Sequence, residues 1–264
     1  MKAYDFEYDG LNLSDKGFML CSFDKSKIDT VENGAEINME TSSFYNGDVN
    51  YIITANYEST LTATFQICKN PCTGEDLNIT VDEVRDMASW LCRKGFHKFK
   101  IFDDDYLNVY YEATFNMSRI IRNGNVIGLE LEMITNRPFG VMEDTVVNIK
   151  NEIENGVENF YSISDDEGFI YPKTKITIKQ DGDLKISNIF VQRDTIIKNC
   201  KAGEVIEMDY PVIKSSLESH KIQNDFNWNF FRIENKFKDK RNLIQISIPC
   251  EIEMVYSPIA KIGI

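Results

Sequence analysis

The chain has 264 residues, and its 29 lysines and arginines against 42 aspartates and glutamates give a formal net charge of −13. This balance argues against a general nucleic-acid binder, which needs a clustered cationic surface, and against docking on an anionic membrane. A hydrophobic fraction of 42% suffices for a packed core and is too high for a disordered chain. We therefore expect an acidic globular protein with one large domain or two small ones.

The N-terminal sequence has no apolar run of the signal-peptide kind, and no apolar stretch approaches the ~18 residues that span a bilayer. We therefore expect synthesis in the cytoplasm without membrane insertion, and the six cysteines are expected to be free, mostly buried thiols. Cys68 and Cys72 have a C-x3-C spacing that would begin a zinc site, but only two histidines are present to complete it. We expect neither a metal nor a cofactor.

One helix is predicted near residues 80–94. Thr80 and Glu83 have the spacing of a capping box, in which a threonine side chain and a glutamate three residues later satisfy the first backbone N–H groups. Apolar side chains then follow at helical spacing: Val84, Met87, Ala88 and Leu91. Gly95 is suited to the residue that ends the helix.

The rest of the first half alternates between apolar and polar residues, as antiparallel strands do. Four segments show this period: 96–101, 110–115, 118–122 and 126–133. The acidic turn Asp103-Asp104-Asp105 separates the first two segments. The last two flank Asn123-Gly124, a dipeptide typical of tight hairpin turns.

Pro138 and Gly140 end the last of these strands, and the polar, acidic segment that follows predicts a domain boundary near residue 140. Residues 141–264 contain short alternating segments, 228–233 among them, at ~8–12-residue spacing and without a predicted helix, which indicates a β-sandwich. The expected fold class is therefore mainly β, with one α-helix in the N-terminal domain, and the expected domains are 1–140 and 141–264.

No catalytic constellation emerges from the sequence. A glycine loop for nucleotides is missing, His97 is predicted on a strand surface, and His220 is predicted in an exposed loop. In so acidic a chain, a carboxylate pair for glycoside hydrolysis stays an open alternative. Calcium binding by the acidic turns 103–105 and 165–167 is a second alternative, although both have the composition of solvated turns.

Trp228 lies between Asn227 and Asn229 and has two interpretations. An exposed indole beside amides would suit a sugar-stacking platform on a lectin-like sandwich. Trp228 also shares a strand face with Phe230 in the predicted strand, and this pattern favours packing in the core.

Several segments occur in a recognisable order: Phe6–Leu11, Ser22–Asp24, Ile28–Ile37, Thr64–Asn70 before the helix, Phe96–Phe102, Glu130–Gly140, Gly203–Asp209, Asn224–Trp228 and Ile252–Pro258. In this order and in its two-domain length the chain resembles the distal tail protein (Dit) family of long-tailed phages and prophages, a component of the baseplate hub. The segments cover nearly the whole chain, and none of them is a catalytic motif.

The resemblance implies that residues 1–140 form a β-barrel-like, tail-tube-like domain that assembles into a ring, usually of six copies, and that residues 141–264 form a galectin-like β-sandwich. It implies a non-enzymatic virion component, assembled in the bacterial host cytoplasm and located at the tail tip. Its partners would be further copies of itself, the tail tube protein, and tail-tip, tail-associated and receptor-binding proteins. The alternative function is a lectin-like protein that attaches to host-surface carbohydrate through Trp228, although the galectin sugar-binding set is reduced here to His220.

Negative charge is concentrated in the first domain. Residues 1–140 carry 13 basic and 22 acidic residues, a net of −9, whereas residues 141–264 carry 16 and 20, a net of −4. A six-fold ring of the first domain would hold a charge of about −54 and would repel DNA phosphates that pass through it. We therefore predict that first-domain carboxylates line the bore, with Asp103, Asp104 and Asp105 as the most concentrated candidates.

Overall fold

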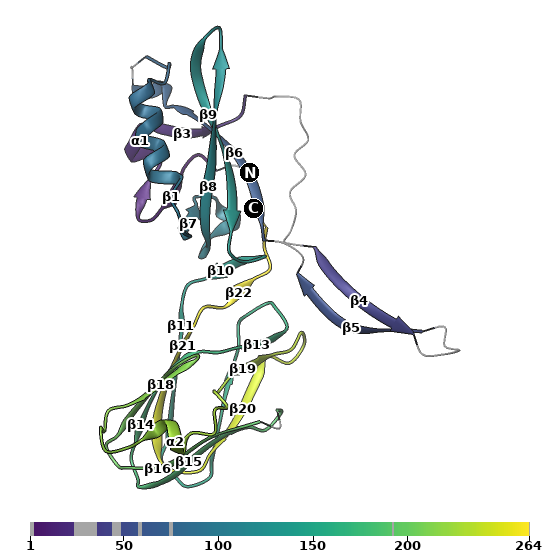
Figure 1. Cartoon of the computed structure of the whole chain (residues 1–264), viewed down its shortest axis with the longest axis vertical. Helices are drawn as coiled ribbons and strands as arrows, with labels where there is room; N and C mark the ends of the chain where they lie inside the picture. The colour runs from purple at the N-terminus through teal and green to yellow at the C-terminus, as the bar shows by residue number, and fades with distance from the viewer. Residues whose placement is uncertain are drawn as a thin grey trace. The chain divides into compact units, whose positions relative to one another are not determined.

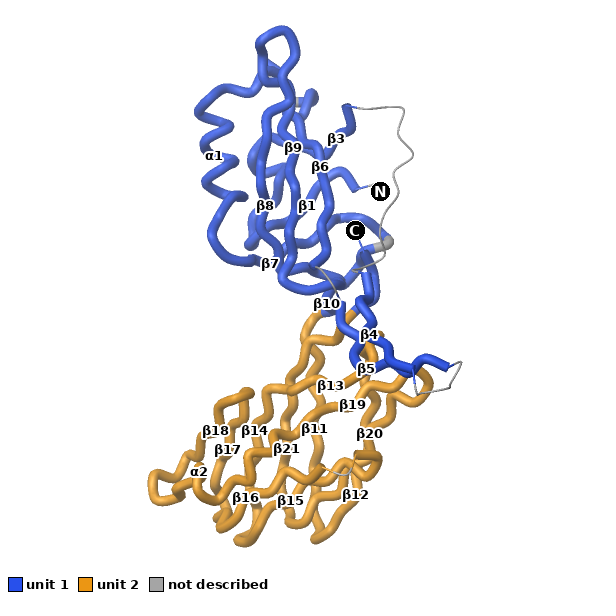
Figure 2. Tube along the Cα trace, turned by 45° about the vertical axis from the view of Figure 1, so that its right-hand side comes forward, with its two compact units in different colours: residues 1–142, 260–264 blue, residues 143–259 orange. Residues whose placement is uncertain are grey.

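The computed structural model describes residues 3–23, 36–43, 49–57, 60–73, 76–191 and 193–263, apart from the side chain of Asp105. The chain divides into unit 1, residues 1–142 and 260–264, and unit 2, residues 143–259 (Figure 2). Unit 2 is therefore an insertion between two segments of unit 1. The sequence-based division placed residues 260–264 in the second domain. The structure groups them with unit 1, where β22 (Ile259–Ala260) pairs with β10 (Gly140–Met142).

Unit 1 is built on a nine-stranded sheet among the described residues (Figure 1). In path order its strands are β2 (Leu11–Asn12), β1 (Phe6–Tyr8), β7 (His97–Ile101), β8 (Val109–Arg122), β9 (Asn125–Thr135), β6 (Thr62–Lys69) and β3 (Phe18–Cys21), with β10 and β22 off this path. The pairings along the path are antiparallel. The mainly β class is confirmed, and within the described ranges the sheet is open and not closed into a barrel. Residues 28–35 of the predicted segment Ile28–Ile37 lie outside the described residues.

The β8–β9 hairpin is the longest pairing in unit 1, and its turn is the one predicted from Asn-Gly. Asn123 has φ 51° and Gly124 has φ 81°. Positive φ at both central residues is what the right-handed twist of a tight hairpin requires, and asparagine and glycine adopt it most readily. The acidic turn 103–105 lies between β7 and β8 as predicted, with the short helix η3 (Asp104–Tyr106) at its end.

The predicted helix is α1 (Val81–Leu91), and its capping box is present. The Glu83 backbone N–H donates to Thr80 Oγ1 at 3.3 Å, and the Thr80 N–H donates to Glu83 Oε2 at 2.7 Å. Val84, Met87, Trp90 and Leu91 are buried in the core of unit 1, where the helix packs on the sheet (Figure 1). The helix ends before the predicted Lys94, because Cys92 leaves the helical region with ψ 59°.

Replacing Thr80 with alanine should lower the free energy of unfolding of unit 1 by about 1 kcal/mol, because the first turn of α1 loses its side-chain acceptor. Chemical denaturation would measure the change. Ser89→Ala, which alters an exposed serine on the same helix, is the control and should stay within about 0.5 kcal/mol of wild type. Equal effects of the two substitutions would contradict a role for the cap.

The core of unit 1 is rich in aromatic rings from β1, β6, β7, β8 and α1. Phe99 on β7 is fully buried at its centre. Its ring centroid lies 5.2 Å from that of Phe6, 5.3 Å from Phe115 and 5.7 Å from Phe65. The alternation that predicted a strand at 96–101 therefore directs Phe99 and Ile101 into this core.

Unit 2 is a sandwich of two antiparallel sheets whose inner faces share one core. The five-stranded sheet runs β11 (Thr145–Asn151), β21 (Cys250–Tyr256), β14 (Lys173–Ile178), β17 (Val205–Asp209), β18 (Val212–Ser215). The four-stranded sheet runs β12 (Gly156–Tyr161), β20 (Arg241–Ile246), β15 (Gly182–Asn188), β16 (Asp194–Cys200). A small pair, β13 (Gly168–Ile170) with β19 (Ile233–Asn235), and a short helix, α2 (Ile222–Asp225), complete the described part of unit 2.

The predicted strand at 228–233 is wrong for most of its length. Only its last residue, Ile233, belongs to a strand, β19, and Trp228 has φ 59°. A positive φ interrupts the two-residue alternation, so Trp228 and Phe230 do not share a strand face. Phe230 is buried at 5% exposure, whereas Trp228 is 55% exposed. The interpretation of Trp228 as a core side chain is therefore wrong.

Candidate functional site

The hairpin of β4 (Ile37–Ser43) and β5 (Asn50–Tyr57) forms a two-stranded sheet of its own (Figure 1). Every residue of β4 is exposed. The register pairs Ile37 with Tyr57 and Met39 with Ala55, so these four side chains share one face. Asn38, Glu40, Thr54 and Asn56 occupy the opposite face. From Ile37 to Glu40 the hairpin therefore has one apolar and one polar face; beyond the register shift at Glu40/Thr41, the exposed side chains of Ile52 and Tyr51 lie on opposite faces.

Large apolar side chains on this hairpin stay open to solvent along its length. Ile37 is 52% exposed, Met39 is 51% exposed and Ile53 is 64% exposed. At its base, the Tyr57 ring lies 4.9 Å from that of Phe139, and Lys261 Nζ lies 5.9 Å and 5.5 Å from these two rings. The hairpin is thus anchored at its base through Tyr57, whereas Ile37 and Met39 stay exposed among the residues that the structure describes. Sequence reasoning missed this hairpin, because alternating apolar residues usually indicate a strand that faces a core.

The acidic candidates of unit 1 lie together on the turn between β7 and β8. Asp103 is half-buried and its carbonyl accepts a hydrogen bond from the Tyr106 N–H at 3.0 Å. Asp104 is exposed. The side chain of Asp105 lies outside the described ones. The turn concentrates negative charge where the interior strands β7 and β8 are joined, and its role as a bore lining stays a prediction.

The second acidic turn contacts a basic loop. Asp165 Oδ1 lies 3.2 Å from Lys240 Nζ, and Glu167 Oε1 accepts a hydrogen bond from the Phe237 N–H at 3.1 Å. These carboxylates therefore offset the positive charge of residues 236–241 and hydrogen-bond to their backbone. Among the described residues, no group of three or more histidine, cysteine, aspartate or glutamate side chains is arranged to hold a metal ion. Cys68 is half-buried on β6, and Cys72 is exposed and free.

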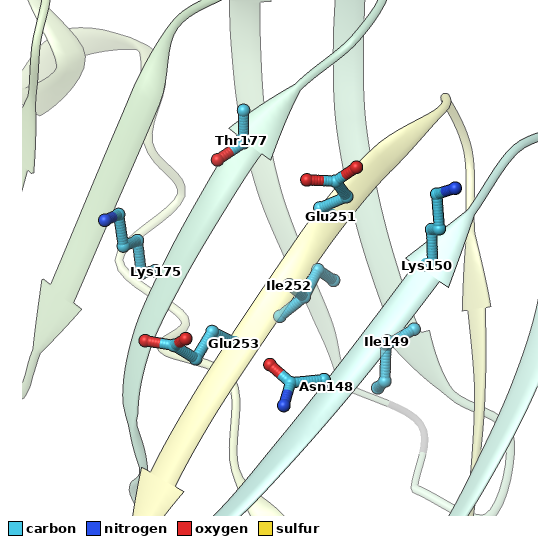
Figure 3. A pocket seen from close by; sticks show the side chains of 8 residues that line it. All are labelled: Asn148, Ile149, Lys150, Lys175, Thr177, Glu251, Ile252 and Glu253. Atoms are coloured by element: carbon cyan, nitrogen blue, oxygen red, sulfur yellow. The ribbon is translucent and has the colours of Figure 1, made fainter.

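A shallow groove crosses the outer face of the five-stranded sheet (Figure 3). Lysines and glutamates from three neighbouring strands line it: Lys150 on β11, Glu251 and Glu253 on β21, and Lys175 on β14. Ile149 and Ile252 lie buried at its floor. Opposite charges alternate across adjacent strands, and Lys179 Nζ lies 3.2 Å from Glu251 at one end. Such cross-strand pairs stabilise the sheet, and the groove offers no aromatic surface to a ligand.

His220 lies in a loop as predicted, but its side chain is buried, so the predicted exposure is wrong. Its side chain is 4% exposed, and Nδ1 lies 2.6 Å from Oε1 of Glu204, whose own side chain is fully buried. On the other side of the ring, Nε2 lies 3.4 Å from Asp225 Oδ2. The polar local sequence at 218–221 suggested a surface loop, and the buried partner is distant in sequence.

Glu204 is held by three donors. The Ser215 hydroxyl donates to Oε1 at 2.6 Å, and the Lys201 N–H donates to Oε2 at 3.0 Å, in addition to the His220 contact. Burial alone would raise the pKa of this carboxyl, but the hydrogen bonds from Ser215, Lys201 and His220 outweigh burial and lower it below its usual value. The network joins the turn before β17, the end of β18 and α2, and it is structural in character.

No helix among the described residues is both long and apolar enough to cross a membrane. A search of curated proteins found no match to this sequence.

Comparison with solved structures shows a similar fold in the Dit protein of phage SPP1, described as a paradigm of the hub adsorption apparatus in phages that infect Gram-positive bacteria. The alignment has a TM-score of 0.63 at 10% identity and covers 97% of this chain and 99% of the SPP1 chain. A family model described as a phage tail protein N-terminal domain matches residues 1–137, and one described as a phage tail C-terminal domain matches residues 139–256. The chain therefore belongs to this family of phage tail proteins.

Proposed function

We propose that this tail protein is a distal tail hub: a ring, of six copies in the expected form, at the end of the tail tube. The ring would join the tail tube protein to tail-tip and receptor-binding proteins and would act without turnover of a substrate. Membership of the phage tail family and a Dit-like fold over nearly the whole chain support this proposal. In it, unit 1 builds the ring and unit 2 lies outside it.

The β4–β5 hairpin is the observation that carries the proposal. Its apolar side chains Ile37 and Met39 are exposed among the described residues of the single chain, and monomeric proteins rarely leave such a ribbon uncovered, because exposed strands with apolar side chains associate. We propose that unit 1 of a neighbouring copy buries these apolar side chains of the β4–β5 hairpin. A hairpin donated by each copy to the next is a head-to-tail contact, and such contacts close into a ring when the rotation between copies permits. Burial of Ile37 and Met39 in the contact would stabilise the ring by roughly 1.5–3 kcal/mol for each side chain.

The acidic turn of unit 1 has a place in this proposal. DNA that leaves the virion passes through the hub, and a wall that carries carboxylates repels phosphate and keeps the polymer from adhering. We assign Asp103 and Asp104 to the wall of the passage, with Asp105 beside them in sequence. A ring whose passage is lined by neutral or basic side chains would contradict this assignment.

Adding charge to the apolar face of the hairpin should abolish the ring. In the double variant Ile37→Asp/Met39→Asp, two carboxylates would have to be buried in the contact, so a monomer is expected where wild type gives a closed ring. Size-exclusion chromatography with light scattering and negative-stain imaging measure this directly.

The matched control, Asn38→Asp/Thr54→Asp, adds the same charge to the polar face of the same hairpin and should keep the ring. Loss of the ring in both double variants, or in neither, would contradict the role of the apolar face. A wild-type chain that stays monomeric both alone and when mixed with its tail tube protein would contradict the hub itself.

A further inference from the structure

Trp228 combines an exposed ring with a strained backbone. Its indole is 55% exposed and its φ is 59°, a left-handed conformation that bulky residues rarely adopt. The other tryptophan in the sequence, Trp90, is 7% exposed and its indole N–H donates to the Tyr8 carbonyl. Both exposure of a large ring and a left-handed φ cost free energy. A structural cause must therefore hold Trp228 in place.

The cause is a set of hydrogen bonds, here called the clamp, that Asn227 makes to β16. This strand is an edge strand of the four-stranded sheet. The Asn227 N–H donates to the Ile196 carbonyl at 3.1 Å, and its Oδ1 accepts from the Ile196 N–H at 3.1 Å. Its Nδ2 donates to the Asp194 carbonyl at 2.8 Å, and its Oδ1 also accepts from the Asn229 N–H at 3.2 Å. These bonds fix the backbone on both sides of Trp228 and prevent its ring from turning into the core.

Buried rings support the indole from below. The Phe226 ring, 4% exposed, lies 5.7 Å from that of Trp228, and the Phe230 ring lies 5.0 Å from that of Phe226. The preceding helix α2 is held by Asp225, which accepts from Asn199 Nδ2 at 3.0 Å and contacts His220. The indole therefore stands on a rigid base, and a ligand that binds it need not order a loop.

The side chains around Trp228 in the chain point to the class of ligand. Gln223 and Asn224 are exposed and Asn229 is half-buried, and each carries an amide with both a donor and an acceptor. Between Ile222 and Asn229 the one charged side chain is Asp225, which is held by His220 and Asn199. A flat apolar ring beside neutral amides matches a pyranose, which has a flat C–H face and a rim of hydroxyls.

We propose that Trp228 is the stacking platform of a carbohydrate site on unit 2, which binds a neutral hexopyranose or N-acetylhexosamine unit of a cell-surface glycan. Asn227 is the positioning residue, since its side chain is occupied by the clamp and acts through Trp228. The proposal is independent of ring formation, because the site lies entirely within unit 2.

Intrinsic fluorescence of the full chain tests the site, because Trp90 is buried and Trp228 is the solvent-exposed reporter. A panel of neutral oligosaccharides built from glucose, galactose, rhamnose and N-acetylglucosamine is the probe. We expect at least one of them to shift the emission to shorter wavelength and to protect it from acrylamide quenching. Trp228→Ala in a glycan array should weaken binding about tenfold or more, and Asn227→Ala should weaken binding while leaving Trp228 quenchable.

Tyr161→Ala is the matched control, since Tyr161 is 65% exposed on β12, at the opposite edge of the same sheet from β16. It should bind glycan as wild type does, and all three variants should keep the wild-type oligomeric state. A panel without any binder would overturn the proposal, as would glycan binding that survives Trp228→Ala. A third outcome would assign the Trp228 indole to a protein contact and overturn the glycan site. In that outcome no glycan binds, and Trp228→Ala loses binding to another tail protein.

Discussion

Glu204→Ala is expected to lower the free energy of unfolding of unit 2 by about 3 kcal/mol or more, because it removes the shared acceptor of three hydrogen-bond contacts and a buried group left unpaired costs ~1–3 kcal/mol. His220 would be left 4% exposed with its Nδ1 unpaired, and the Ser215 hydroxyl and Lys201 N–H would lose their acceptor. A buried donor without a partner costs the full desolvation of that group. Denaturant unfolding, followed by Trp228 fluorescence in a Trp90→Phe background, reports on unit 2.

The pH dependence follows from the lowered pKa of Glu204. A carboxyl whose pKa is lower in the folded state stabilises the fold above its unfolded pKa of about 4.3, and this stabilisation is lost as the pH falls through the folded pKa. Wild-type unit 2 should therefore lose more stability between neutral pH and acid than Glu204→Gln, which cannot titrate. Parallel pH profiles for the two proteins would show that the carboxylate is not stabilised in the fold.

Two further variants test whether the loss of stability depends on the contact between Glu204 and His220 or follows from the removal of any glutamate charge. Glu207→Gln changes an exposed glutamate on β17 and should stay within about 0.5 kcal/mol of wild type. His220→Gln should be strongly destabilising alone and should add little to Glu204→Gln, because the two side chains act together. Additive effects would contradict the coupling between His220 and Glu204.

Phe99→Ala should lower the free energy of unfolding of unit 1 by about 3–5 kcal/mol, as large-to-small changes at fully buried phenylalanines do. The side chain is 0% exposed and contacts the rings of Phe6, Phe65 and Phe115, so its removal leaves a cavity among these three rings. Trp90 fluorescence in a Trp228→Phe background reports on this unit, since the Trp90 ring stacks on that of Phe6 at 6.0 Å.

Phe96→Ala is the control for this substitution. Phe96 precedes β7 and is 46% exposed, so the same truncation leaves no cavity and should cost well under 1 kcal/mol. A loss at Phe99 as small as the loss at Phe96 would mean that the core of unit 1 can collapse around the missing ring.

Local patterns predicted the parts of the fold that local interactions determine. The Thr80–Glu83 capping box and the helical spacing of Val84, Met87 and Leu91 identify α1, because the cap and the buried face both lie within the helix. Asn123-Gly124 identifies the β8–β9 turn for the same reason. The family resemblance added the tail-protein assignment, which the residue patterns alone did not provide.

Interactions distant in sequence determined what local patterns missed. The His220 side chain is buried because its Nδ1 contacts Glu204, 16 residues earlier, and nothing in the polar sequence around it signals this contact. Trp228 is exposed because Asn227 binds β16, a strand that lies about 30 residues earlier. The apolar face of β4 resembles a core-facing strand, because a sequence pattern does not distinguish a face that packs within its own chain from one left open.

The insertion of unit 2 between β10 and β22 has an evolutionary consequence. Because these two strands pair, the chain leaves and re-enters unit 1 at neighbouring points. Domains whose ends lie close together are tolerated as insertions, since the host fold needs only a closed connection at that place. A phage lineage could therefore exchange, enlarge or shorten the inserted module by recombination without rebuilding unit 1, so that the two parts of one polypeptide are free to diverge at different rates.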